Sequence, residues 1–242
     1  AFKFHNGHRS TILHARHSFH GKSIATGSIT DSPEVAFSFQ KLQEVDSFDP
    51  DNVSELYSVF ERNQKSTGES NVYAVIIEPF SASLCTSRSE EFLKELRRLC
   101  DATGAILIFD EVYSGWGRTG SLFYFTRYTN LVPDILTYSK AFGGGKASIS
   151  GYTTRKSIYE IAYGKPTDSL LHSTTYFGFG EETATALEAV NIVIEDNYAD
   201  KAKLIEQHIS GISETLKSKH KQKILSFRGA GAHWGIQIRT PN

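Results

Sequence analysis

Two residues of this 242-residue chain, Lys140 and Asp110, have types and positions suited to covalent and electron-withdrawing chemistry. Each follows or ends an apolar run, 105–110 or 134–138, and in a parallel sheet the carboxyl ends of such strands meet at one crevice. A lysine amine whose pKa is lowered by burial or nearby positive charge forms a Schiff base with an aldehyde. A carboxylate beside a pyridine nitrogen keeps that nitrogen protonated, so the ring accepts electrons released when a substrate Cα–H bond breaks. The pair therefore indicates a site for an aldehyde-bearing pyridine ring, in which Lys140 also serves as base.

A nucleotide site is the first alternative, because AILIFDE at 105–111 looks like the Asp-Glu strand of P-loop ATPases. Such a protein also needs glycine, four residues, and then Gly-Lys-Ser/Thr. The run 21–23 (GKS) would require glycine at position 16, which is Arg16. The pair 145–146 (GK) would require glycine where Lys140 stands. Both matches fail, which argues against this class.

Strand-like and helix-like segments alternate along the chain, and this order is typical of an α/β fold with a mainly parallel sheet and helices on both faces. The first residues, AFKF, also look helical. The expected strands are Thr11–Ala15, Val72–Glu78, Ala105–Asp110, Asp134–Tyr138, Ile149–Thr153 and Gly231–Ile238. The expected helices are Val53–Gln64, Ser89–Cys100 (which opens with capping residues), Glu182–Ile194 and Ala199–Leu216.

Composition excludes several classes of protein. The 26 Lys and Arg balance 27 Asp and Glu, which gives no electrostatic reason to expect nucleic acid or a membrane as partner. The two cysteines, Cys85 and Cys100, are too few for a disulfide framework, and a cytoplasmic location is the default. Five histidines between positions 5 and 20 lack helical spacing and accompanying acids, so turn or surface histidines are expected there and no metal site. The absence of methionine suggests a fragment of a longer protein.

Longer segments around the two residues resemble the class III (ω-amino acid type) aminotransferases, which are fold-type-I enzymes that use pyridoxal 5'-phosphate. FDEVYSGWGRTG at 109–120 is similar to their FDEVQTGFGRTG segment, and PDILTYSKAFGGG at 133–145 is similar to their PDI-x-T-x-x-KA-x-GGG segment. Four more similar segments follow the family's order: ARHSFHGKS at 15–23, VIIEP at 75–79, HSTTYFG at 172–178 and RGAGAHWGIQI at 228–238. The resemblance covers nearly the whole chain.

The resemblance implies a fold-type-I large domain and a role for each matching residue. Lys140 and Asp110 are the implied catalytic residues, on the aldehyde and on the pyridine nitrogen. Around the cofactor ring, the resemblance implies Phe19 stacked on one face with His20 beside it, and Val112 on the other face. It also implies Glu78 as an acid near Asp110 and Tyr113 at the ring 3-hydroxyl. Thr175, or Thr174 if the alignment slips by one, would bind the cofactor phosphate of a neighbouring subunit. The resemblance therefore also implies a homodimer with shared active sites. The implied reaction transfers an amino group from an amine or amino acid to a 2-oxo acid through a Lys140 Schiff base.

The chain also departs from the family. Tyr113 stands where glutamine is usual, and FSASLCTSRSEE at 80–91 replaces a Gln-Gly-rich segment that lines the substrate pocket, so the substrate stays open. The comparison implies that residues 1–227 form the large domain without its N-terminal phosphate-binding loop, and that 228–242 begin the small domain. Aminomutase, racemase or decarboxylase chemistry on the same scaffold stays open, as does a truncated chain without catalysis.

Overall fold

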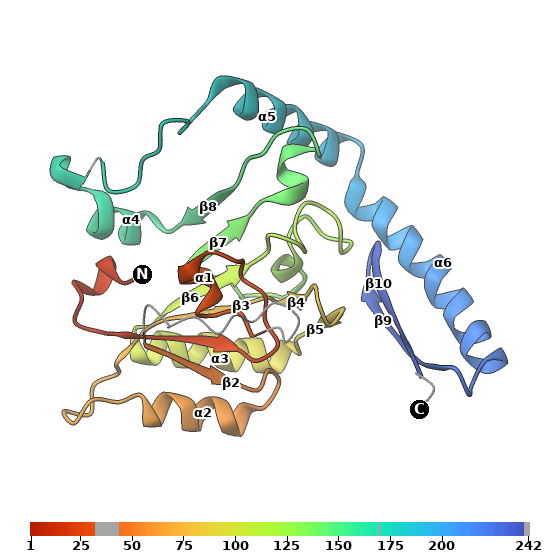
Figure 1. Ribbon diagram of the computed structural model, residues 1–242, viewed down its shortest axis with the longest axis horizontal. Coiled ribbons are helices and arrows are strands. Elements are labelled where there is room, and N and C mark those ends of the chain that lie inside the picture. Colours follow the sequence, from red (N-terminus) through yellow and green to blue (C-terminus); the bar gives the residue numbers. More distant parts are fainter. Residues whose placement is uncertain (32–43, 169, 240–242) are drawn as a thin grey trace.

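A six-stranded sheet forms the centre of the computed structural model, which describes residues 1–31, 44–168 and 170–239 (Figure 1). The strand order is β2-β1-β3-β6-β7-β8. The strands are β1 (Thr11–Ala15), β2 (Glu44–Phe48), β3 (Val72–Ile77), β6 (Ile106–Asp110), β7 (Ile135–Tyr138) and β8 (Gly151–Thr154). The first five run parallel to their neighbours, and only the edge strand β8 is antiparallel, to β7. The predicted α/β class with a mainly parallel sheet is confirmed.

The central strands are apolar along their whole length because both faces of the sheet are covered. All six residues of β3 (VYAVII) are buried, the pattern expected for a strand in the interior of a parallel sheet. Helices α2 (Val53–Arg62) and α3 (Glu90–Thr103) cover one face, where Leu56 and Phe92 pack against Leu107 in the main core. Ser89 caps α3 by accepting a hydrogen bond from the Phe92 N–H, as its sequence predicted.

The second face is covered by shorter elements. Ile158 of α4 (Lys156–Tyr163) packs against Ile12, Ile76 and neighbouring apolar residues, together with the N-terminal segment. The helix expected at the start of the chain is only a 3₁₀ turn, η1 (Lys3–His5), which ends at Asn6 in a left-handed conformation. Helix α1 (Ile24–Gly27) is a single turn. Helices therefore lie on both faces, as predicted, although α4 was not foreseen.

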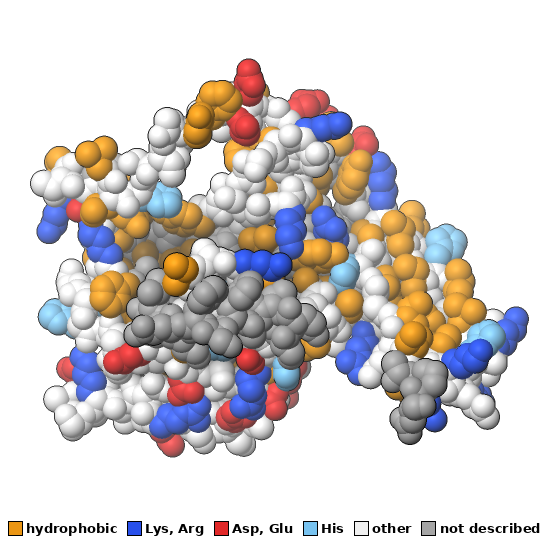
Figure 2. All heavy atoms as spheres, viewed as in Figure 1, with side chains coloured by type: hydrophobic (Ala, Val, Ile, Leu, Met, Phe, Trp, Pro, Cys, Tyr) orange, Lys and Arg blue, Asp and Glu red, His pale blue; other side chains and the backbone are white. Residues whose placement is uncertain are grey.

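The C-terminal part contains two long helices and a hairpin. Helix α5 (Gly180–Glu195) lies at the top of the view in Figure 1, and α6 (Tyr198–Lys219) continues down its right side. The antiparallel strands β9 (Ile224–Ala230) and β10 (His233–Ile238) pack beside α6. Apolar side chains gather on the surface over these elements (Figure 2). The last predicted strand begins at His233 because Gly231, with a φ of 57°, lies in the turn before it. The predicted domain boundary after residue 227 falls inside β9, and the division into domains remains a prediction.

Three short elements complete the frame of the site. A small hairpin, β4 (Phe80–Ser81) with β5 (Thr86–Ser87), follows β3. The 3₁₀ turn η2 (Tyr124–Arg127) closes the loop after β6, and η3 (Lys140–Gly143) follows β7. The remaining 3₁₀ turn within the described ranges, η4 (Pro166–Asp168), follows α4.

Candidate active site

The predicted site residues other than Thr175 come from the carboxyl ends of four neighbouring parallel strands. Asp110 is the last residue of β6, and Lys140 opens η3 directly after β7 and Ser139. Glu78 follows β3, and the segment with Phe19 and His20 follows β1. Since β1, β3, β6 and β7 are adjacent and parallel, residues separated by more than a hundred positions meet at one sheet edge.

Asp110 is a buried carboxylate held by three donors. The His20 ring donates from Nδ1 to Oδ2 at 2.8 Å, and Oδ1 accepts from the Val112 N–H at 3.1 Å and the Thr137 hydroxyl at 3.2 Å. Burial alone would raise the pKa of Asp110, but the hydrogen bonds from His20, Val112 and Thr137 outweigh it and lower the pKa. Asp110 is therefore ionised at neutral pH. Of the roughly four acceptor positions of a carboxylate, these bonds use three.

Glu78 ties the Phe19 segment to the sheet. Its Oε2 accepts from the Phe19 N–H at 3.3 Å and its Oε1 from the Ala82 N–H at 3.3 Å. Burial raises the pKa of Glu78, partly opposed by His20 and reinforced by Asp110. Glu78 therefore holds the backbone of Phe19, directly before His20, and its predicted place in the cofactor site stays a prediction.

Lys140 has a backbone conformation that is unusual for its residue type. Its φ of 52° lies in the left-handed region, and a side chain with a Cβ is held there only by its surroundings. Partial burial lowers the pKa of the Lys140 amine, and Arg118 lowers it further, whereas Asp110 and Glu78 act in the opposite direction. A lowered pKa increases the fraction of neutral amine, which is the nucleophilic form.

Tyr113 lies directly beside Lys140. The Lys140 Nζ is 4.7 Å from the centre of the Tyr113 ring, and the Arg118 guanidinium carbon is also 4.7 Å from it. The Tyr113 hydroxyl is 2.6 Å from Nδ1 of His233, a residue of β10. The Val112 N–H binds Asp110, as described, so the Val112–Tyr113 pair connects the two predicted catalytic residues.

Thr175 is not brought to this edge of the sheet. It lies in the exposed run 170–180 between α4 and α5 (Figure 1), and within the described ranges no hydrogen bond joins it to Asp110 or Lys140. Thr174 lies in the same exposed run. The proposed reach of this segment to a second subunit stays a prediction.

Three participants in the site were not foreseen as such. Thr137 is the register partner of Asp110 on β7, so alternation along DILTY could have indicated that its hydroxyl faces the carboxylate. Arg118, in the loop after β6, lies over the Tyr113 ring. His233 follows Tyr113 by 120 positions, and nothing in its local sequence indicates that contact.

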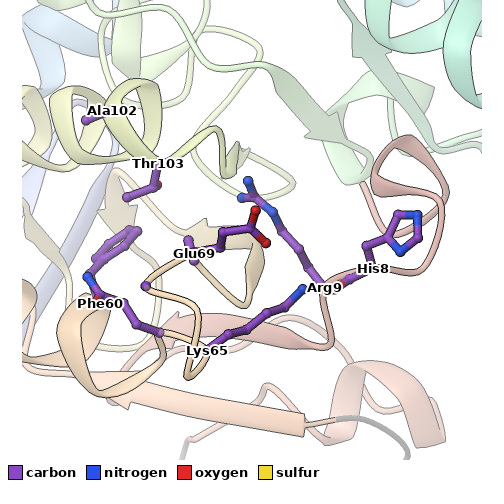
Figure 3. Close-up of a pocket in the computed structure, with 10 residues that line it drawn as sticks. His8, Arg9, Phe60, Lys65, Glu69, Ala102 and Thr103 are labelled. Atoms are coloured by element: carbon purple, nitrogen blue, oxygen red, sulfur yellow. Dashed lines mark hydrogen bonds between the residues drawn. The ribbon is translucent and has the colours of Figure 1, made fainter.

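A cavity of about 510 Å³ lies elsewhere, at the amino ends of β1, β3 and β6 (Figure 3). Arg9, Lys65 and Glu69 extend into it from the segments that precede β1 and β3. It is at the opposite edge of the sheet from Asp110 and Lys140, where α/β sheets do not bind their ligands.

Within the described ranges no three His, Cys, Asp or Glu side chains are grouped as metal ligands. No helix in those ranges is long and apolar enough to cross a bilayer.

The family model for class III aminotransferases matches residues 1–242, and the chain belongs to this family. A putrescine aminotransferase of Pectobacterium atrosepticum is 32% identical over 233 residues, which are 95% of this chain and 48% of that protein. An acetylornithine aminotransferase of Methanosarcina acetivorans is 31% identical over 240 residues, 96% of this chain and 55% of that protein. The chain thus spans about half the length of the curated relatives it matches.

Solved structures share the fold. An ornithine aminotransferase from Toxoplasma gondii, with partial occupancy of pyridoxal phosphate at its active site, superimposes with a TM-score of 0.80 at 22% identity, over 96% of this chain and 52% of that one. A transaminase from the marine bacterium Virgibacillus gives a TM-score of 0.85 at 23% identity, over 95% and 53%. These likenesses confirm the predicted fold-type-I architecture.

Proposed function

We propose that this chain carries the cofactor site of a pyridoxal-phosphate-dependent aminotransferase, which moves an amino group from an amine or amino acid to a 2-oxo acid. One observation carries the proposal: an ionised, buried Asp110 and an amine of lowered pKa on Lys140 lie at the ends of adjacent parallel strands. Family membership supports it, because class III aminotransferases use this cofactor.

The residues present fit the cofactor. Asp110 has one acceptor position left after its three hydrogen bonds, and a protonated pyridine nitrogen supplies one donor. The Nε2 atom of His20 is buried and has no partner within the described ranges, so this end of the site holds a polar atom that a ligand can satisfy. Phe19 and Val112 would pack on the ring faces and Tyr113 would lie at the ring oxygen.

When bound, the cofactor supplies an aldehyde for amine exchange and a pyridinium ring that accepts electrons. The chain's own residues then have separate tasks. Asp110, kept ionised by its donors, holds the ring nitrogen protonated. Lys140 would hold the aldehyde through its amine, and as a free neutral amine it would remove and return the proton at the substrate Cα. Lys140 must therefore cycle between neutral and protonated forms, and its lowered pKa serves this task.

We further propose a homodimer in which Thr175 of each subunit binds the phosphate in the other. The segment that would cross to the partner is unusually apolar for an exposed one: Leu170 is 82% exposed, Tyr176 74% and Phe177 70%. Exposed apolar side chains gathered in one segment mark an interaction surface. Sedimentation of the full chain would give twice the monomer mass, and a monomer that still transaminates would refute shared sites. The cytoplasmic location stays a prediction.

The test of the main proposal is spectroscopic. The full chain mixed with pyridoxal phosphate should develop the visible band of a lysine-bound cofactor, and Lys140→Ala should abolish it. Lys146→Ala is the matched control, because Lys146 is an exposed lysine of the same glycine-rich loop. Absence of the band in the unmutated protein would refute the cofactor site.

The reaction type needs a second measurement. Putrescine and acetylornithine are the donors to test first, since they are named in the two relatives. Nitrogen should pass from the donor to an added 2-oxo acid, and product formation should stop when the acid is left out. Turnover that does not depend on the acceptor would instead indicate an aminomutase, racemase or decarboxylase.

A further inference from the structure

His233, in the C-terminal hairpin, contacts Tyr113, the residue whose ring lies against the Lys140 amine. Its Nδ1 is 2.6 Å from the Tyr113 hydroxyl, and the two rings meet edge to face with centres 4.6 Å apart. Phe80 also packs edge to face against the imidazole, with ring centres 5.7 Å apart. The imidazole is thus fixed in both position and orientation.

The contacts of Nε2 determine which nitrogen of His233 carries the proton. Nε2 lies 3.1 Å from the carbonyl oxygen of Ala82, and a carbonyl oxygen only accepts hydrogen bonds. Burial lowers the pKa of His233, the Ala82 carbonyl opposes this, and Arg118 and Lys140 lower it further, so the ring is neutral at pH 7. A neutral imidazole with its proton on Nε2 has a lone pair on Nδ1. The Tyr113 hydroxyl must therefore donate to His233.

The same arrangement holds when Cys85 is included. Its sulfur is 3.1 Å from Nε2 of His233 and 3.7 Å from the Ala82 oxygen. The thiol can donate weakly to the carbonyl while its sulfur accepts weakly from Nε2–H, which leaves the imidazole proton on Nε2. Burial raises the pKa of the Cys85 thiol, so it stays protonated.

The hairpin that carries His233 is seated against the loop that carries Tyr113. The Ala232 N–H donates to the Arg118 carbonyl at 2.9 Å, and a Cβ at Gly231 would overlap that same carbonyl. A Cβ at Gly235 would lie 2.8 Å from the Cys85 sulfur. These close backbone contacts fix where His233 stands relative to Tyr113.

We propose that His233 is a positioning residue of the Lys140 site: it accepts the hydrogen bond of the Tyr113 hydroxyl, holds the Tyr113 ring against the Lys140 amine, and leaves the phenol oxygen able only to accept from a ligand. This inference rests on the proposed function. The ring face stabilises the ammonium form of Lys140, since an aromatic ring attracts a cation within about 6 Å of its centre. Because the Tyr113 hydroxyl already donates to His233, its oxygen can only accept a hydrogen bond from a ligand. The site therefore favours a ligand with a protonated atom next to Tyr113.

Several charged or titratable groups surround this pair. Arg118 and Lys140 both lie over the Tyr113 ring, from the loop after β6 and from η3. Cys85 is next to Nε2, and Arg228 of β9 acts on the pKa of Cys85. Asp110 and Glu78 act on Lys140 from the ends of β6 and β3. His233→Leu leaves all of these in place, so a change in the titration of Lys140 reports on Tyr113.

The test reads the Lys140 amine in the full chain before the cofactor is added. The rate of its modification by trinitrobenzenesulfonate is followed against pH and assigned by mass spectrometry of the Lys140 peptide. His233→Leu releases the Tyr113 ring, so the titration midpoint should fall by about half a pH unit, the shift that corresponds to a cation–ring interaction. His233→Asn keeps an acceptor at the Nδ1 position and should restore most of the midpoint.

Two further variants separate positioning from other effects. Tyr113→Leu should lower the midpoint as much as His233→Leu does, and the double variant should lower it no further. His208→Leu, which replaces an exposed histidine of α6, should leave the midpoint unchanged. A purely structural histidine would lower the thermal unfolding temperature in His233→Leu without moving the midpoint, and that result would overturn the proposal. A double variant that shifts beyond Tyr113→Leu would also overturn it, because His233 would then act on Lys140 by another route.

The outcome does not depend on cofactor binding. If the shifts occur but the unmutated protein forms no visible band with pyridoxal phosphate, the proposed function fails while the contact of His233 with Tyr113 stands. If the band forms and the midpoints coincide, the proposed function stands and the positioning role of His233 fails.

Discussion

Replacement of Asp134 should be the most destabilising single change at an ion pair within the described ranges. Asp134 precedes β7, with its side chain only 10% exposed, and its Oδ2 accepts from the Arg97 guanidinium and from the Leu107 N–H of β6, both at 2.8 Å. Its Oδ1 accepts from Arg155 at 3.0 Å. One carboxylate thus joins helix α3 to two adjacent strands of the sheet.

The magnitude follows from what Asp134→Ala leaves behind. The Arg97 side chain is 11% exposed, and among the described residues it would keep only Asp101, which is 66% exposed, as an acidic partner. An uncompensated buried charge costs about 3–5 kcal/mol, and the unpaired Leu107 N–H falls within about 1–3 kcal/mol. Because Asp101 still compensates Arg97 in part, we expect a total loss of about 4 kcal/mol in the free energy of unfolding.

The assay is urea unfolding of the full chain, followed by circular dichroism at fixed protein concentration. Glu160→Ala is the matched control, since its pair with Lys156 is exposed at both ends and should contribute less than about 1 kcal/mol. Replacing Asp134 and Arg97 together by leucine should cost less than Asp134→Leu alone, because no buried charge is then left unpaired. A loss below about 1 kcal/mol for Asp134→Ala, or a double variant worse than the single one, would refute the reasoning.

Three other outcomes can be measured in the same protein. Burial raises the pKa of Glu111 from 4.5 to about 7. Because the folded state then binds the proton more tightly than the unfolded state, the free energy of unfolding should fall by about 3 kcal/mol as the pH rises from about 4.5 to about 7. Glu111→Gln should flatten that slope in urea titrations at several pH values. Asp110→Asn removes the charge that faces the ring nitrogen, so the transamination rate should fall about 10²-fold or more, whereas an unchanged rate would contradict its role. Phe92→Ala opens a cavity in a fully buried part of α3 and should cost about 3–5 kcal/mol in urea unfolding.

The sequence predicted the central strands well because their apolar runs reflect burial on both faces. The run Thr11–Ala15 is β1 as predicted, and β3, β6 and β7 begin or end within one residue of their predicted limits. Strand β2 was missed because its residues, EVDSF, are mostly polar and it lies at the edge of the sheet. Its position depends on pairing with β1, which local sequence does not reveal.

The site was predictable only where chemistry and strand ends coincide. Asp110 and Lys140 could be paired from their positions after apolar runs, and parallel neighbours bring such ends together. The bond between His20 and Asp110 depends on how the loop after β1 turns back over the sheet, and His233 arrives from a hairpin more than a hundred residues away. Contacts of this kind depend on the tertiary structure, so neither composition nor periodicity contains them.

The origin of the site residues from separate strands links ligand binding to the integrity of the sheet. His20, Glu78, Asp110 and Lys140 follow or end four different strands, and no single hairpin or helix carries two of them. A ligand that contacts all four residues binds the assembled sheet and not its separated parts. Its binding therefore raises the free energy of unfolding, by about 2.7 kcal/mol when the free ligand concentration is a hundred times its Kd. Cofactor supply would then set how much of the chain is folded, and therefore how much of it withstands proteolysis.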